Sequence, residues 1–212
     1  MKQDKLTDFF NQNYTLVFAF FFVFIPGIAI LAPVFMHLNY LVPARLIYSI
    51  FRFACHQLPY RSFFLFGNQP YYPLAEANMG QNIVTFEQAI QNPDMKFSEI
   101  QAFIGNPEMG YKTALCQRDI AIYLSIALFC IFFIISKNRI PRLHWSLWIV
   151  FGLIPIALDG FSQMLSNIVP FINRESTPMI RVLTGALFGF MTSWFLIPYL
   201  EMKIQETSSD SN

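Results

Sequence analysis

A run of 23 residues without a charged side chain, from Tyr14 to Met36, constrains the fold of this chain more than any other feature. As a helix the run would be about 35 Å long, enough to cross the roughly 30 Å hydrocarbon core of a bilayer. It is longer than the core of a signal peptide, about 7–15 residues, and no cleavage pattern follows it. The sequence therefore predicts a first membrane-spanning helix that stays in the mature protein.

Three more apolar segments extend this prediction to a bundle of about four membrane-spanning helices. With 55% hydrophobic and only 13% charged residues, the whole chain is too apolar for an ordinary soluble domain. The predicted spans cover residues 14–39, 118–136, 144–168 and 178–200. We expect an all-α, polytopic membrane bundle that forms a single integral membrane domain over residues 1–204.

The segments between and after the spans have their own predictions. Residues 41–56 are too short to cross a bilayer, and Arg45 and Arg52 lie seven apart on one helical face, which indicates an interfacial or re-entrant helix. Residues 68–115 are predicted to form a small extramembrane helical cap, too small for an independent catalytic domain. The polar residues 205–212 have the composition of a disordered tail.

The distribution of cations predicts an orientation in the cell membrane. The short connection between the second and third spans holds Lys137, Arg139 and Arg142 without an acid, a positive-inside signal. That connection is expected in the cytoplasm, and four spans then place both termini there. The opposing signal is a group of arginines on the predicted outer side: Arg45, Arg52 and Arg61.

Two short strings supply candidate metal ligands. Cys116 and Asp119 form a C-x-x-D in the place where zinc sites often have C-x-x-C, and Cys55 and His56 would complete a four-ligand set. The predicted ion is zinc, although adjacent residues such as Cys55 and His56 do not easily ligate one ion together. Two alternatives stay open: a disulfide between Cys55 and Cys116 in an oxidising compartment, and thiols with neither role.

Polar residues within the later spans are predicted to join this site. Asp159 and Gln163 lie i, i+4 on the third span, and Glu175 and Arg181 flank the start of the fourth. The topology brings them to the same membrane face as the cysteines. An ionisable residue inside a span is functional or paired by default, and the expected partner of Asp159 is Arg118 or Arg181. The alternative is a structural ion pair that only fixes helix packing.

Four segments in order carry a resemblance to a known family. They cover residues 55–64, 116–123, 155–163 and 175–185. They resemble motifs of domain of unknown function 2085, a family of prokaryotic multi-pass membrane proteins, and the resemblance extends from about residue 47 to 189. Many members carry a second cysteine where this chain has Asp119, and residues 68–112 are long for the family. The resemblance implies a membrane fold and a site, and it implies no reaction.

Three functions fit these observations. The first is a membrane-embedded enzyme for a lipid or lipid-linked substrate, in which the metal polarises an oxygen or activates water. Its predicted catalytic residues are Asp159 as base, Gln163 and Glu175, while Arg118 and Arg181 bind an anionic headgroup, one of them paired to an acid and the other left for the ligand. The second is a transporter or channel-like protein for a cation or small solute, and the third is a structural or assembly protein.

The enzyme is favoured because the polar groups gather at one membrane face, whereas a transport path needs polar groups through the full depth. The expected partners are membrane lipid and a lipid-linked or anionic small molecule. The net charge of +1 gives no electrostatic footprint for nucleic acid.

Overall fold

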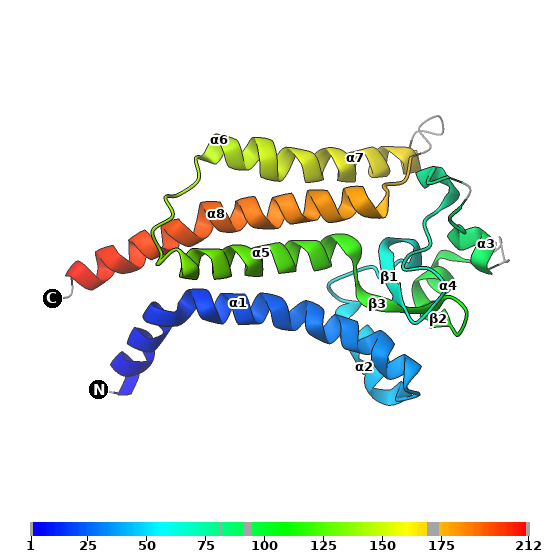
Figure 1. Cartoon of the computed structure of the whole chain (residues 1–212), viewed down its shortest axis with the longest axis horizontal. Helices are drawn as coiled ribbons and strands as arrows, with labels where there is room; N and C mark the ends of the chain where they lie inside the picture. Colours follow the sequence, from blue (N-terminus) through cyan, green and yellow to red (C-terminus); the bar gives the residue numbers. More distant parts are fainter. Residues whose placement is uncertain (1, 81, 91–94, 169–173, 211–212) are drawn as a thin grey trace.

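Four long helices lie side by side in the computed structural model, which describes residues 2–80, 82–90, 95–168 and 174–210 (Figure 1). The elements of the bundle are α1 (Lys2–His37), α5 (Gln117–Ile135), α6 (Trp145–Leu147) continued by the π-helical η3 (Trp148–Leu153) and α7 (Ile154–Ile168), and α8 (Pro178–Asp210). Stretches long and apolar enough to cross a membrane cover residues 13–37, 117–135, 145–166 and 178–207. The predicted helical membrane bundle with four spans is confirmed.

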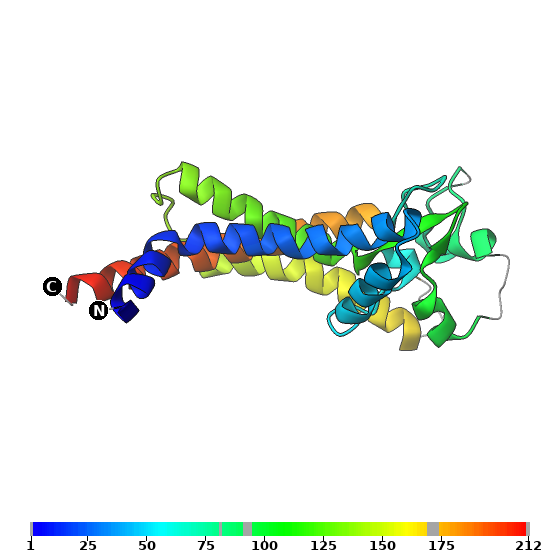
Figure 2. The same ribbon diagram turned by 90° about the horizontal axis from the view of Figure 1, so that it is seen from below.

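Helix α5 lies at the centre of the bundle, between α1 on one side and α8 on the other, and α7 packs on α8 (Figure 1). Both termini lie at the same end of the bundle in both views (Figures 1 and 2). Toward that end, fully buried Phe129, Cys130 and Phe133 fill the interior with Ala19 and Ile197. The assignment of this end to the cytoplasm stays a prediction from the loop charges.

Close contact between α5 and α8 depends on two glycines. A Cβ atom on Gly189 would lie 2.2 Å from the Ser125 Oγ and 2.4 Å from the Ile122 carbonyl oxygen, and one on Gly185 would lie 2.7 Å from the Arg118 carbonyl oxygen. The G-x-x-x-G spacing thus lets the two backbones approach as small residues do in membrane helix pairs.

The opposite end of the bundle carries a cap of mixed structure. Its elements are α2 (Leu41–Phe51), η1 (Pro59–Arg61), β1 (Ser62–Leu65), η2 (Ala75–Ala77), α3 (Phe86–Ile90), α4 (Phe97–Ala102), β2 (Gly105–Asn106) and β3 (Gly110–Cys116). The strands form an antiparallel sheet in the order β1-β3-β2. The helical cap predicted over residues 68–115 thus contains the helices α3 and α4 and, in addition, strands that the sequence does not predict.

A turn between β2 and β3, at the Asn-Pro pair that favours one in the sequence, brings these two strands together. The side chain of Asn106 accepts hydrogen bonds from the backbone N–H groups of Glu108 (3.0 Å) and Met109 (2.7 Å), which closes an Asx-type turn between β2 and β3. Gly110 follows with a φ of 77°, in the left-handed region that favours glycine.

Two predicted boundaries also change. The interfacial helix predicted over residues 41–56 ends at Phe51, so Cys55 and His56 lie in irregular backbone. The composition of residues 205–212 predicts disorder, yet α8 continues through Asp210, while 211–212 lie outside the described residues. The extension fits local side-chain pairs, Lys203 with Glu206 at 2.6 Å and Gln205 with Glu201 at 2.9 Å, that support a helix three and four residues apart.

A buried lysine connects the cap to its surroundings. Lys112 on β3 is fully buried, and its Nζ donates to the carbonyl oxygens of Gln57 and Gln101, while its own carbonyl accepts from the Tyr48 hydroxyl. Within the described residues it forms no salt bridge. Burial lowers the pKa of Lys112 to about 7.

This lysine predicts a pH dependence of stability. The folded-state pKa of about 7 lies below the usual lysine value of about 10.4, so the unfolded state binds more protons between these values. The free energy of unfolding should therefore rise with pH through this window, with the full penalty present below about pH 7. Lys112→Met should flatten that rise, as measured by thermal unfolding in detergent. Equal slopes in the variant and the parent would contradict this prediction.

Alanine substitution should test the close contact of α5 with α8. Gly189→Ala inserts a methyl group against backbone and should destabilise the protein by about 1–3 kcal/mol, the usual range for overpacking. Gly27→Ala is the matched control, because no atom lies within 4 Å of its added Cβ. Thermal unfolding of both variants decides the point, and similar melting temperatures would show that the contact is loose.

Candidate functional site

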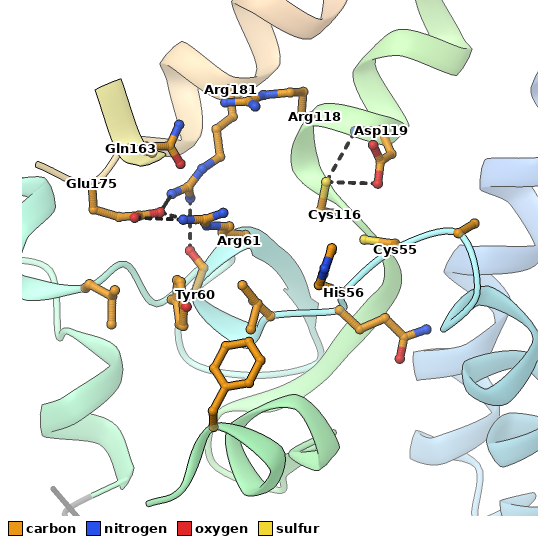
Figure 3. A pocket seen from close by; sticks show the side chains of 15 residues that line it. Cys55, His56, Tyr60, Arg61, Cys116, Arg118, Asp119, Gln163, Glu175 and Arg181 are labelled. Atoms are coloured by element: carbon orange, nitrogen blue, oxygen red, sulfur yellow. Dashed lines mark hydrogen bonds and ion pairs between the residues drawn. The ribbon is translucent and has the colours of Figure 1, made fainter. Parts of the chain in front are cut away.

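A cavity of about 560 Å³ lies where the bundle meets the cap. All four sequence motifs that carried the family resemblance contribute to its wall: the segment after α2, the start of α5, the middle of α7 and the residues around the start of α8 (Figure 3). Its lining consists of Ala54, Cys55, His56, Gln57, Leu58, Tyr60, Arg61, Leu74, Phe97, Cys116, Arg118, Asp119, Gln163, Glu175 and Arg181.

Three potential metal ligands converge on one side of the cavity. The Sγ atoms of Cys55 and Cys116 and a carboxylate oxygen of Asp119 all lie within 4.8 Å of one another (Figure 3). A tetrahedral zinc ion holds its ligand atoms about 3.5–4 Å apart, so a small side-chain adjustment would bring the three onto one ion. The residue types and their spacing thus fit zinc or a similar ion.

His56 does not join these three ligands, so the predicted four-ligand set is incomplete in this geometry. Its ring is exposed and lines the same cavity, outside the group formed by Cys55, Cys116 and Asp119. The physical reason is the irregular backbone between α2 and η1, in which neighbouring side chains need not point the same way. Gln57, the next residue, has a φ of 53°, which bends the chain at this point.

Part of this arrangement has a local structural explanation. Cys116 is the N-cap residue of α5: its Sγ accepts from the Asp119 backbone N–H at 3.5 Å, and its S–H donates to the Asp119 carboxylate at 3.0 Å. Capping therefore accounts for the C-x-x-D spacing. It does not account for Cys55, which a separate segment brings to the same place.

The two cysteines that face each other are both free thiols. Hydrogen bonding with Cys116 lowers the pKa of the Cys55 thiol, and the same interaction together with burial raises the pKa of Cys116 well above its usual value. Cys55 is thus the more readily ionised of the pair, and the thiolate is the form that binds metals.

Guanidinium groups and a carboxylate form the other side of the cavity. Arg61 donates two hydrogen bonds to Glu175, at 2.8 and 2.9 Å, and Arg181 donates to the same carboxylate. Arg181 is almost completely buried and also donates to the Tyr60 carbonyl at 3.0 Å and to the Gln117 side chain at 3.4 Å. Its Nε has no hydrogen-bond partner among the described residues.

A second ion pair lies just behind the cavity wall. Arg118 donates to the buried carboxylate of Asp159, which also accepts from Ser176 at 3.0 Å and from Gln163 at 3.3 Å. Arg174 lies 3.7 Å from its other oxygen. Asp159 itself does not line the cavity. Of the two partners predicted for Asp159, the structure shows Arg118.

Eight of the nine predicted site residues line this one cavity, and the ninth, Asp159, lies behind its wall. The eight are Cys55, His56, Cys116, Arg118, Asp119, Gln163, Glu175 and Arg181. The expectation that one arginine stays unpaired is wrong, because Arg118 and Arg181 each bond to an acid. Sequence reasoning missed the roles of Arg61, Tyr60 and Ser176. Arg61 and Tyr60 lie in the first motif and Ser176 in the fourth, which was their only signal.

Comparison with known proteins agrees with the membrane assignment. A family model described as predicted membrane protein (DUF2085) matches residues 108–195, which contain three of the four motifs that carried the resemblance. An uncharacterized protein of Methanocaldococcus jannaschii is 25% identical over 202 residues, covering 91% of this chain and 96% of that protein. No solved structure matches the chain.

Loss of the Glu175 charge should reveal how far the ion pairs support the fold. Glu175→Gln would leave the buried Arg181 without its carboxylate and should destabilise the protein by about 3–5 kcal/mol. Glu206→Gln removes a carboxylate from an exposed pair with Lys203 and should cost less than about 1 kcal/mol. Thermal unfolding in detergent compares them, and equal effects would show that the Glu175 cluster is not structural.

Proposed function

We propose that the protein is a membrane-embedded, metal-dependent enzyme that acts on an anionic lipid or lipid-linked substrate. One observation carries the proposal: a group of three metal-type ligands and a wall of arginines face each other across one cavity at the end of an apolar bundle. The metal ligands suit catalysis, the arginines suit an anion, and the position suits a substrate that arrives from the bilayer.

The balance of charge around the cavity favours an anionic ligand. The four arginines Arg61, Arg118, Arg174 and Arg181 stand against three acids, Asp119, Asp159 and Glu175. The side chains of Arg61 and Arg118 are 31% and 22% exposed, so they can contact a ligand while they hold their acids. Arginine binds phosphate and carboxylate groups in bidentate geometry, which makes these two the proposed headgroup ligands.

The three-ligand group resembles the open coordination of catalytic zinc, in which a fourth position remains for water or substrate. A divalent ion at Cys55, Cys116 and Asp119 would polarise a substrate oxygen or activate water. The exposed His56 in the same cavity is placed to transfer a proton. Asp159 is better suited to position Arg118 than to act as a base, because Arg118, Gln163 and Ser176 surround its carboxylate.

Transport is less well supported by the bundle interior. A path across the membrane needs polar groups through its full depth, whereas Phe129, Cys130 and Phe133 fill the half that lies away from the cap. The aromatic rings of Phe190 and Trp194 pack against the same cluster. Among the described residues, the buried polar side chains in this part of the bundle are the hydroxyls of Thr15, Ser125 and Ser193, and none of them is charged.

Metal content should provide the first test of the proposal. Protein purified without chelators is expected to hold close to one equivalent of zinc or a similar divalent ion, lost in Cys116→Ser because a hydroxyl is a poor ligand. Cys130→Ser, which changes a buried thiol elsewhere in α5, should keep the metal. Elemental analysis measures both. A metal-free parent with a Cys55–Cys116 disulfide in its mass spectrum would replace the enzyme with a structural role.

The enzymatic part has a separate readout in the same preparation. The metal-loaded parent, incubated in vesicles made from a total lipid extract, should convert an anionic lipid into products that lipid mass spectrometry detects. The Cys116→Ser variant should not. A protein that holds zinc yet changes no lipid in the extract would keep the metal site and contradict the lipid-directed reaction.

A further inference from the structure

A second, smaller cavity of about 230 Å³ lies beside α2 and shares Gln57 with the first. Here it is named the α2 cavity. One wall is a face of α2 and the other is the end of α4 with the residues that follow it. The lining consists of Arg45, Tyr48, Ser49, Arg52, Gln57, Gln101, Ala102 and Ile104.

The α2 cavity is cationic and has no internal counter-charge. Arg45 and Arg52 both line it, and the lining includes no acid. Neither guanidinium group has a hydrogen bond or a salt bridge within the part of the chain that the structure describes. Behind the wall, the Nζ of buried Lys112 bonds to the carbonyl oxygens of Gln57 and Gln101, both of them lining residues. Two arginines therefore gather here without a carboxylate, beside the buried amine of Lys112.

The packing and the exposed surface of α2 fit a place at the level of the lipid headgroups. Next to its arginine face, α2 and the residues after it expose an apolar stripe of Val42, Leu46, Ile50 and Phe53, with 81%, 60%, 58% and 97% of their surface accessible. The helix has 11 residues, too few to span, and it packs against α1, the first span. A short helix with an apolar stripe beside arginines is typical of segments that lie in the membrane interface.

We propose that the α2 cavity binds the phosphoryl group of an anionic phospholipid from the leaflet next to the cap. Arg45 and Arg52 hold the phosphate oxygens, the Ser49 hydroxyl adds a donor, and the acyl chains lie along the apolar stripe of α2. This site is independent of the larger cavity and of the reaction proposed there. It also explains why arginines occur at the end of the bundle opposite the cationic loop between α5 and α6.

Native mass spectrometry of the full chain in detergent can test the site. The protein is titrated with phosphatidylglycerol and, separately, with phosphatidylcholine of the same acyl chains. Phosphatidylglycerol should bind more tightly. The double variant Arg45→Gln/Arg52→Gln should weaken that binding by more than about tenfold, since each arginine loses a charge-assisted hydrogen bond to the phosphate.

Matched variants separate a specific site from general charge. Lys137→Gln/Arg139→Gln removes the same charge from exposed positions at the other end of the bundle and should change the affinity little. Ser49→Phe fills the α2 cavity without a change of charge and should also prevent binding.

Several results would overturn the proposal. Equal losses in the two double variants would mean that only net charge attracts the lipid, and equal affinity for phosphatidylcholine would remove the anionic preference. Normal binding by Ser49→Phe would place the lipid elsewhere. Displacement of the lipid by equimolar glycerol phosphate would show that the ligand is a soluble phosphate ester rather than a lipid.

Discussion

Paired charges at the cap end of the bundle hold together the segments that form the site. Arg118 on α5 pairs with Asp159 on α7, and Glu175 bonds both to Arg181 on α8 and to Arg61 in the cap. Inside an apolar bundle, removal of one partner of an ion pair costs several kcal/mol, because the other charge stays buried without compensation. The same pairs that shape the cavity wall therefore fix the relative positions of three helices and the cap.

The sequence predicts the spans and the main ion pair well, because each follows from one large energetic cost. A long apolar run is most stable in the interior of a bilayer, and the buried carboxylate of Asp159 needs a cation as its partner. The sheet of the cap follows no such rule. Its strands β1 and β3 pair Ser62 with Cys116, far apart in the chain, and the strand β2 has only two residues. Local pattern cannot show a pairing of that kind.

The candidate site, too, has features that the sequence predicts and features that only the structure shows. Residue types identify the participants, but which cation pairs with which acid depends on three-dimensional approach. The Arg61–Glu175 pair joins residues 114 positions apart, and no spacing in the sequence indicates it. The orientation of His56 depends on the backbone bend at Gln57, whose positive φ is unusual for a residue other than glycine.

The two sides of the larger cavity balance their charges by different means. On the arginine side, four cations, Arg61, Arg118, Arg174 and Arg181, outnumber the two acids that they contact, Asp159 and Glu175, so an anionic ligand would complete the balance. On the ligand side, Cys55, Cys116 and Asp119 are all acids at close range, and they cannot all ionise together without a cation. In the structure the S–H of Cys116 donates to Asp119, so a proton occupies the place that a metal ion would take. On the proposal of a metal site, binding of a divalent ion there would release protons, which is the general behaviour of thiolate sites.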